Sequence, residues 1–281
     1  MSEKGNRIDN WNADYSPLAT SYTENPTTAG ELSNLIRHEI VLEDIRKYLP
    51  NVENPSIVEV GCGGARTSIY LARRGFEVTC TDFSPEAIRL ARANFEAAGT
   101  TGRLVQDDLL RSTLSAGAFD CVMSFGLLEH FDRISDPIAS MTRLIRPGGL
   151  QLHVIIPKRL STQSVMDAVW FPGRLLRNAI RGQFERIVER SFRQFPHFES
   201  SFKPSDYIAS FSEAGNEVLR CEAAGMIYPF FALPGPLGRT LVRIGHPAIR
   251  AAARFVDRTE RKPLVNAAPG FYLVLRRRLN T

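Results

Sequence analysis

Cysteine is scarce in this chain of 281 residues, which contains only four. None of them forms a CxxC pair or stands at a metal-ligand spacing from a histidine. We therefore expect neither a disulfide framework nor a zinc site, and no metal at all. Small thiols in a reducing compartment account for all four positions. These positions are Cys62, Cys80, Cys121 and Cys221.

Long apolar runs are also missing. No stretch of about 18 uninterrupted apolar residues occurs, so no membrane-spanning helix is expected. The first residues, MSEKGNRID, are polar and lack the apolar segment of a secretory signal peptide. No internal repeat or low-complexity tract is visible. These absences make the cytoplasm the expected location.

Acidic residues become rare in the second half of the chain. Up to residue 157 there are 15 Lys and Arg against 20 Asp and Glu, whereas from residue 158 onward there are 20 against 10. Such asymmetry can mark a surface for phosphates, nucleic acid or anionic membrane, and arginines on solvated helix faces are the alternative. No aromatic-basic motif of an RNA-binding module is present, so no nucleic-acid partner is expected.

Residues 56–83, SIVEVGCGGARTSIYLARRGFEVTCTDF, are the most informative stretch. The apolar run at 57–60 predicts a buried strand, and residues 67–74 return to helical spacing. Between them, the glycines of GCGG permit positive φ and a close approach of backbone to ligand. A second strand is predicted at 77–81 and ends at Asp82. Open α/β sheets bind ligands outside such strand ends, so we expect a ligand site between the turn and Asp82.

The glycine spacing argues against a nicotinamide cofactor. In a G-x-G-x-x-G fingerprint that starts at Gly61, the sixth position here is Arg66, which suits close helix–strand packing poorly. Asp82 nevertheless stands where such folds bind ribose hydroxyls. A nicotinamide-dependent oxidoreductase remains an alternative, as does a non-catalytic binding protein with the same fold.

Strands and helices alternate along the rest of the chain, which predicts a parallel, doubly wound α/β sheet. Ser84 and Pro85 supply an N-cap hydroxyl and a first-turn proline for a helix that runs to Gly99. Further helices are expected at 28–49, 137–145 and 207–215. Further strands are expected at 103–106, 119–125, 150–156, 217–222 and 271–276.

Several short motifs, in order, resemble one known family. They are VEVGCG at 58–63, TDFSP at 81–85, VQDDL at 105–109, FDCV at 119–122, LEH at 128–130 and LIRPGG at 144–149. Their order and spacing resemble the class I S-adenosylmethionine-dependent methyltransferases, in particular the ubiquinone-biosynthesis-like (type 11) small-molecule branch. The resemblance covers about residues 57–157. One departure is Ala65, where the family usually has glycine.

The resemblance implies a Rossmann-like, seven-stranded, mostly parallel sheet with helices on both faces, an antiparallel last strand and insertions forming a lid. It implies four segments. Residues 1–50 would form an N-terminal lid and helix, 51–157 the S-adenosylmethionine-binding core, and 158–202 a first insertion over the substrate. Residues 203–281 would form the C-terminal half of the core, with a second insertion at about 225–268.

The resemblance also implies S-adenosylmethionine as cofactor, S-adenosylhomocysteine as product, and roles for eight residues. Those at the amino-acid end are Glu59, Gly61 and Gly63. Asp82 would accept the ribose hydroxyls and Phe83 would contact the adenine face. The adenine amino group would meet Asp108, whose role Asp107 could exchange, with Leu109 lining the base and Phe125 bordering the sulfonium.

Catalysis and acceptor binding are less defined. A base would help with an oxygen acceptor, and His130 is the first candidate because it follows the fourth strand; a structural histidine at a helix start is the alternative. His197, in the first insertion, is a weaker candidate, and a carbon acceptor would need less from either. Aromatic side chains are weak candidates for substrate binding. They are Trp11, Tyr15 and Tyr22 in the N-terminal segment and Trp170 and Tyr228 in the insertions.

Both insertions interleave arginine with apolar residues, as basic amphipathic helices do. Such helices can lie on a membrane surface, possible here at the inner face of a membrane, or they can pack on the domain. The pattern favours an acceptor with a hydrophobic and an anionic part. We therefore expect methyl transfer to oxygen or carbon of a small-molecule, lipid-linked or sugar-linked acceptor, and the sequence leaves the oligomeric state open.

Overall fold

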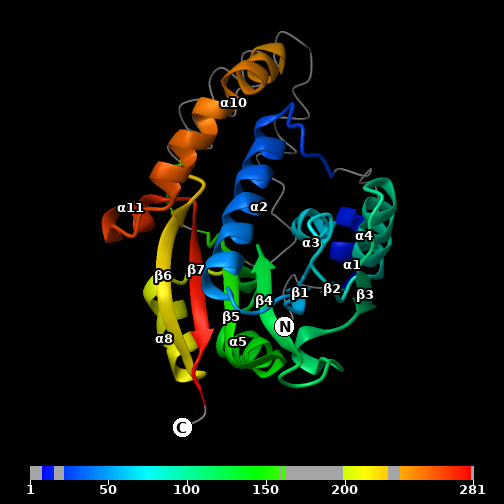
Figure 1. Ribbon diagram of the computed structural model, residues 1–281. Coiled ribbons are helices and arrows are strands. Elements are labelled where there is room, and N and C mark those ends of the chain that lie inside the picture. Colours follow the sequence, from blue (N-terminus) through cyan, green and yellow to red (C-terminus); the bar gives the residue numbers. More distant parts are fainter. Residues whose placement is uncertain (1–7, 16–21, 159, 163–198, 227–234, 280–281) are drawn as a thin grey trace.

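A computed structural model describes residues 8–15, 22–158, 160–162, 199–226 and 235–279 of the chain, in which seven strands form one sheet (Figure 1). The strands lie in the spatial order β3-β2-β1-β4-β5-β7-β6. They are β1 (Ile57–Val60), β2 (Val78–Asp82), β3 (Arg103–Gln106), β4 (Phe119–Phe125), β5 (Ile145–Ile155), β6 (Asn216–Ala224) and β7 (Gly270–Arg277).

Pairing is parallel from β3 through β5, and β7 pairs antiparallel with both β5 and β6. The seven-stranded, mostly parallel sheet with an antiparallel last strand is therefore confirmed. Strand order reverses between β1 and β4, because the chain first winds outward to β3 and then returns. The carboxyl ends of β1 and β4 thus flank the crevice where ligands of such sheets bind.

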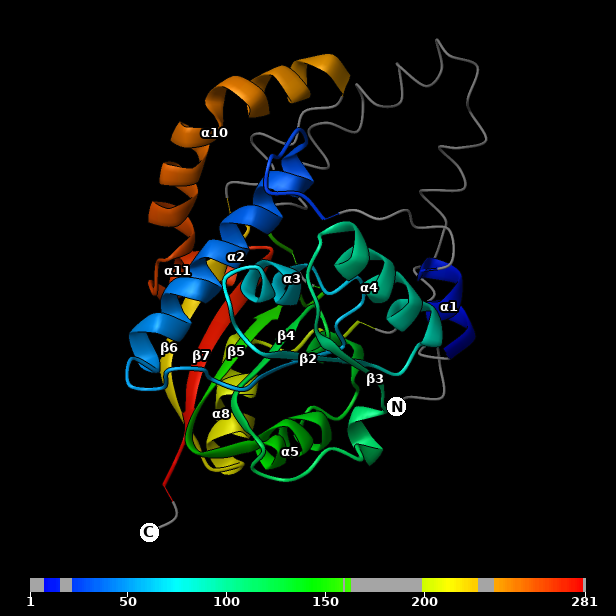
Figure 2. The ribbon, with the colours of Figure 1, turned by 45° about the vertical axis from the view of Figure 1, so that its right-hand side comes forward.

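Helices cover both faces of the sheet (Figures 1 and 2). On one face, α2, α3 and α4 pack through Ile45, Ile69 and Phe95, and on the other, α5 and α8 pack through Met141 and Phe211. The helices are α1 (Ile8–Tyr15), α2 (Ala29–Tyr48), α3 (Arg66–Ala72), α4 (Pro85–Ala97), α5 (Ser135–Leu144), α8 (Pro204–Glu213), α10 (Gly235–Asp257) and α11 (Lys262–Ala267), with short 3₁₀ turns η1 (Leu109–Arg111) and η2 (Leu128–His130).

Local capping signals fix where α4 begins. The Ala87 N–H donates to Ser84 Oγ at 3.2 Å, and Pro85 occupies the first turn, as the sequence predicts. This start holds the chain directly after Asp82 in a fixed direction. The cap therefore positions the end of β2 at the crevice.

Two elements differ from the sequence-based expectation. β5 begins at Ile145 rather than at 150, and it includes Gly148 and Gly149. Ile145 already pairs with Phe119 of β4, and the register shifts before Leu150 pairs with Cys121. The segment Ile8–Tyr15 forms a helix, α1, for which no helix was expected. Propensity alone does not mark so short a helix, because isolated helices of this length are marginal.

The second insertion forms α10 and α11, and α10 runs beside α2 in both views (Figures 1 and 2). Within the described part of the chain, no helix is both long and apolar enough to span a bilayer. The same part contains no group of three or more side chains that could hold a metal ion. Most of the first insertion lies outside the described residues, so the expected segment boundaries remain predictions.

Candidate functional site

The turn after β1 and the end of β2 are fastened to each other. The Cys62 N–H donates to the Thr81 carbonyl at 2.9 Å, and the Gly63 N–H donates to Asp82 Oδ2 at 3.0 Å. The Ser84 N–H donates to the second carboxylate oxygen of Asp82 at 3.0 Å. These bonds favour the charged carboxylate, but burial outweighs them and raises the pKa of Asp82. The carboxylate is thereby held rigidly at the carboxyl edge of the sheet.

The glycine turn has no room for side chains. Gly61 and Gly63 have φ values of +66° and +50°, a region in which side chains are strained. A Cβ at Gly61 would lie 2.8 Å from the Leu127 side chain, and one at Gly63 would lie 2.9 Å from the Tyr15 hydroxyl. Ala65 also has positive φ, at +53°, which explains why glycine suits that position. The turn therefore presents bare backbone to a ligand.

A small cavity of about 50 Å³ brings together most of the predicted cofactor residues. Asp82 and Phe83 from the end of β2 line one side, and Asp108 and Leu109 after β3 line the next. His130 lines it from η2, after β4. The cavity thus combines carboxylates, apolar side chains and the backbone of Gly61, the donor and acceptor set that a nucleoside requires.

The helix α1 covers this cavity. The Trp11 ring meets His130 edge-on with centroids 4.9 Å apart and stacks beside Tyr15. Ser84 Oγ donates to Asn12 Oδ1 at 2.7 Å, which ties α1 to the start of α4. Trp11 and Tyr15 therefore lie at the site. The predicted lid role of the N-terminal aromatics accords with this placement and remains a prediction.

Tyr22 lies elsewhere. Its hydroxyl donates to Glu24 at 2.6 Å, and Glu24 in turn pairs with Arg73 and Arg74 on the far end of α3. Among the described residues, Tyr22 lines neither cavity. The packing of its ring against Arg73 gives it a structural environment instead.

Glu59 lies behind the glycine turn rather than in the cavity. Ser68 donates to its Oε2 from both the hydroxyl, at 2.5 Å, and the N–H, at 3.1 Å. Burial raises the pKa of Glu59 to about 7 against these bonds. This placement joins β1 to the first turn of α3, so Glu59 supports the turn from below.

Asp107 and Asp108 have different partners. Asp107 Oδ1 accepts from the N–H and hydroxyl of Thr113, at 2.9 and 3.0 Å, whereas Asp108 Oδ1 accepts from the Leu110 N–H at 3.1 Å. Both carboxylates line the small cavity. Which of them meets the adenine amino group therefore remains open.

Arg37 is a site residue that the sequence reasoning missed. Its guanidinium lies 5.2 Å over the Phe125 ring, and Nη2 donates to Asn34 Oδ1 at 2.7 Å. Its Nε is buried and has no partner among the described residues. Burial lowers the pKa of Arg37 to about 10, with Glu59 opposing the shift, so the group stays charged at neutral pH. One signal was available, because apolar residues on nearly all sides of α2 indicate a buried helix.

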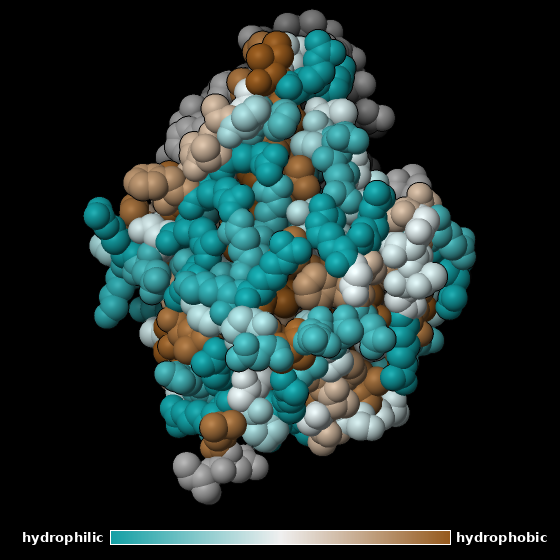
Figure 3. All heavy atoms as spheres, viewed as in Figure 1, coloured by the Kyte–Doolittle hydropathy of each residue, from teal (hydrophilic) through white to brown (hydrophobic). Residues whose placement is uncertain are grey.

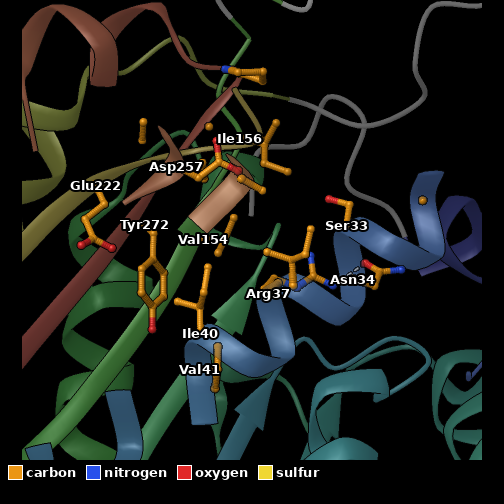
Figure 4. A pocket seen from close by; sticks show the side chains of 18 residues that line it. Ser33, Asn34, Arg37, Ile40, Val41, Val154, Ile156, Glu222, Asp257 and Tyr272 are labelled. Atoms are coloured by element: carbon orange, nitrogen blue, oxygen red, sulfur yellow. Dashed lines mark hydrogen bonds between the residues drawn. The ribbon is translucent and has the colours of Figure 1, made fainter. Parts of the chain in front are cut away.

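A second cavity, of about 480 Å³, is lined in part by Arg37 (Figure 4), whose guanidinium lies over the Phe125 ring. Arg37 and Ile40 of α2 face Val154 of β5 across it. The ends of β6 and β7 and the C-terminal part of α10 complete the wall, which is mainly apolar. A space of this size and lining suits a small organic molecule.

Three candidates lie outside the described residues. They are His197, Trp170 and Tyr228.

Residues 57–149 match a family model described as "Methyltransferase domain". A ubiquinone biosynthesis O-methyltransferase from Methylocella silvestris is 29% identical over 157 residues, covering 55% of this chain and 61% of that protein. One from Rickettsia canadensis is 27% identical over 199 residues, covering 69% and 75%. The match to the first of these relatives thus spans less than two thirds of its length.

Among solved structures, the [4+2]-cyclase SpnF superposes with a TM-score of 0.55 at 15% identity, covering 97% of this chain and 92% of that one. At this identity the likeness shows the fold. The sheet, the glycine turn, the Asp82 carboxylate and the family match together define a methyltransferase domain at residues 57–149. It is of the class I S-adenosylmethionine-dependent kind, and S-adenosylmethionine is its cofactor.

Proposed function

We propose that the chain transfers the methyl group of S-adenosylmethionine to an oxygen or carbon atom of a small, largely apolar acceptor. The observation that carries this proposal is Asp82, held by Gly63 and Ser84 at the carboxyl end of β2 beside a bare glycine turn. A rigid carboxylate in this position is suited to a ribose diol.

The cofactor would extend from the small cavity toward Arg37. Phe83 and Leu109 would enclose the adenine, Asp82 would accept the ribose hydroxyls, and the turn at Gly61 would contact the methionine part. Arg37 would hold the methionine carboxylate, since its buried guanidinium makes no ion pair among the described residues and its Nε lacks a partner. Glu59, held by Ser68, would keep the turn in place.

When bound, the cofactor supplies a methyl group on a positively charged sulfur, which is already a good leaving group. The protein's task is then to hold the acceptor in line at near-attack distance, which can contribute roughly 7–11 kcal/mol to lowering the barrier. The larger cavity is lined by Arg37, whose guanidinium lies over the ring of Phe125, the residue expected at the sulfonium. Its apolar wall would exclude water and orient the acceptor.

An oxygen acceptor would lose a proton during transfer. His130 lines the small cavity, and it would take that proton where the acceptor, held in the larger cavity, meets the cofactor. The names of the two curated relatives specify O-methylation for those proteins, which favours oxygen over carbon here. The proposal includes lipid-linked and sugar-linked acceptors. Screening candidate acceptors with a labelled methyl donor distinguishes them.

Calorimetry with S-adenosylmethionine and S-adenosylhomocysteine tests the proposed cofactor contacts. We expect micromolar binding to the wild type and a loss of at least about tenfold in Asp82→Asn, because a neutral amide accepts more weakly from two hydroxyls. Asp132→Asn, an exposed carboxylate after η2, is the matched control and should bind as the wild type does. Tight binding of NAD in place of both compounds would contradict the proposal.

A further inference from the structure

Among the described residues, the helix α10 packs on the fold along one face. Val242 and Ala253 are fully buried and pack against Leu32 and Ile36 of α2. Three arginines of the C-terminal half and its end reach acidic residues of α2. Arg250 pairs with Glu39, Arg254 pairs with Glu39 and Glu43, and Arg258 pairs with Glu43 and Asp44. The helix is therefore held in a defined orientation.

A second, apolar face of α10 is turned to solvent. Leu237, Leu241, Ile244, Ala248, Ala251 and Phe255 follow one another at intervals of four and three residues, which places them in one stripe along the helix. The large side chains of this stripe are exposed, with Leu237 at 68%, Ile244 at 72% and Phe255 at 86%. In Figure 3 brown and tan spheres follow α10 along the upper left margin.

Single exposed apolar residues are ordinary on protein surfaces and need no explanation. The α10 stripe is different because its members share one face over the full length of a 23-residue helix. This face is not the one that packs on the fold, because the helix packs through the buried side chains of Val242 and Ala253. The ion pairs with α2 hold it in that orientation.

The charges along α10 are positive up to its last residue. Between residues 225 and 256 the chain contains no Asp or Glu. In the N-terminal half of α10, Arg239 and Arg243 are exposed and make no ion pair with any described residue. The one acid of the helix, Asp257, lies at its C-terminal end and accepts from the Met226 N–H at 2.8 Å. An apolar helix face flanked mainly by cations is complementary to an apolar surface that carries anions.

We propose that the α10 stripe (Leu237, Leu241, Ile244, Ala248, Ala251 and Phe255) docks on an anionic lipid surface. The helix would lie in the plane of the interface, with the stripe among the acyl chains and Arg239 and Arg243 reaching lipid phosphates. A second copy of the chain fits less well, because pairing two stripes would bring like-charged arginines together. The inference is independent of the proposed catalytic function.

Vesicle flotation of the full-length protein tests the docking. Vesicles of phosphatidylcholine alone are compared with vesicles in which phosphatidylglycerol replaces part of it. We expect the wild type to float with the anionic vesicles, with an affinity about tenfold or more above that for neutral ones and reduced by high salt. Ile244→Glu combined with Phe255→Glu should abolish flotation, and Arg239→Gln combined with Arg243→Gln should remove the preference for anionic lipid.

The control variant is Leu279→Glu, which changes an equally exposed leucine, at 71%, near the opposite end of the molecule (Figure 1). It should float as the wild type does. All four proteins should keep the same melting temperature and affinity for S-adenosylhomocysteine, since the altered side chains are exposed and distant from the small cavity. These readouts separate loss of docking from loss of fold.

Three results would overturn the proposal. The stripe variant could float like the wild type, or the wild type could bind neutral and anionic vesicles equally. Alternatively, light scattering could find a dimeric wild type that does not float and a monomeric stripe variant. That last result would assign the stripe to a second copy of the chain.

Discussion

The Asp82 carboxylate accepts two backbone N–H groups and still has lone pairs available, because a carboxylate can accept about four hydrogen bonds. The same two bonds that fix its position also favour its charged form. A single residue thus links the glycine turn of β1, the end of β2 and the start of α4. Its effect on ligand binding and its effect on local order are for this reason coupled. Asp82→Asn also loses one of the two backbone bonds, because its amide NH2 cannot accept from the Gly63 or the Ser84 N–H.

Substitution of His130 should change the turnover number differently for an oxygen acceptor and for a carbon acceptor. With an oxygen acceptor, His130→Gln should lower turnover by about 10²–10⁴-fold while leaving cofactor affinity within about twofold, because only the proton transfer is lost. The measurement is kcat with a labelled methyl donor beside calorimetry of S-adenosylhomocysteine. Turnover close to that of the wild type would indicate a carbon acceptor or another base.

Glu129 should make stability depend on pH. Burial raises its pKa to about 7 from its usual 4.5, while the Ile156 N–H donates to its Oε1 at 3.2 Å. Between pH 4.5 and 7 the folded carboxyl keeps its proton when the unfolded one has lost it, so the free energy of unfolding falls as pH rises. Glu129→Gln removes this fall.

We therefore expect the melting temperature of Glu129→Gln, relative to the wild type, to increase from pH 5 to pH 8. Glu59 has a pKa raised in the same direction but is present in both proteins, so the difference isolates Glu129. A difference that is constant over this range would mean that Glu129 ionises as it does in the unfolded chain.

At the scale of elements, the α2–α10 contact depends on ion pairs between segments about 211 residues apart in sequence. Glu43→Lys breaks the pairs with Arg254 and Arg258 and places three cations together. We expect the free energy of unfolding to fall by about 1 kcal/mol at low salt, because the side chains are partly exposed. Added salt should reduce the loss.

Chemical denaturation of Glu43→Lys and of Glu53→Lys, at low and at high salt, measures this effect. Glu53 is exposed and makes no ion pair among the described residues, so its substitution should cost little. Combining Glu43→Lys with Arg254→Glu restores an ion pair of reversed sign and should recover part of the lost free energy of unfolding. If the double variant loses as much as Glu43→Lys alone, residues 43 and 254 do not pair directly.

Elements with strong local signals were predictable from the sequence, and those set by distant contacts were not. Ser84 and Pro85 marked the start of α4, and the alternation of strands and helices gave the parallel sheet. The apolar residues around α2 indicate a buried helix, but they do not place Arg37, whose contacts depend on packing between α2 and the ends of β4 and β5. The orientation of α10 depends on acids of α2 far away in sequence.

At the scale of the whole molecule, ligand binding should stabilise the fold as a unit. S-adenosylhomocysteine at 100 times its dissociation constant should raise the free energy of unfolding by about 2.7 kcal/mol. For a chain of this size the melting temperature should rise by about 5 °C. Thermal unfolding with and without ligand measures the shift, and Asp82→Asn at the same ligand concentration should show little of it.

Among the described strands β7 comes last along the chain, yet it lies inside the sheet between β5 and β6. During synthesis, the edge of β5 that pairs with β7 therefore stays unpaired while more than a hundred further residues are added. The larger cavity also lacks the wall that Gly270 and Tyr272 provide until that moment. A nascent chain could thus complete the proposed cofactor half early, but the cavity proposed for the acceptor is complete only after β7 has emerged. A stop codon before Gly270 would leave β5 and β6 without the strand that joins them.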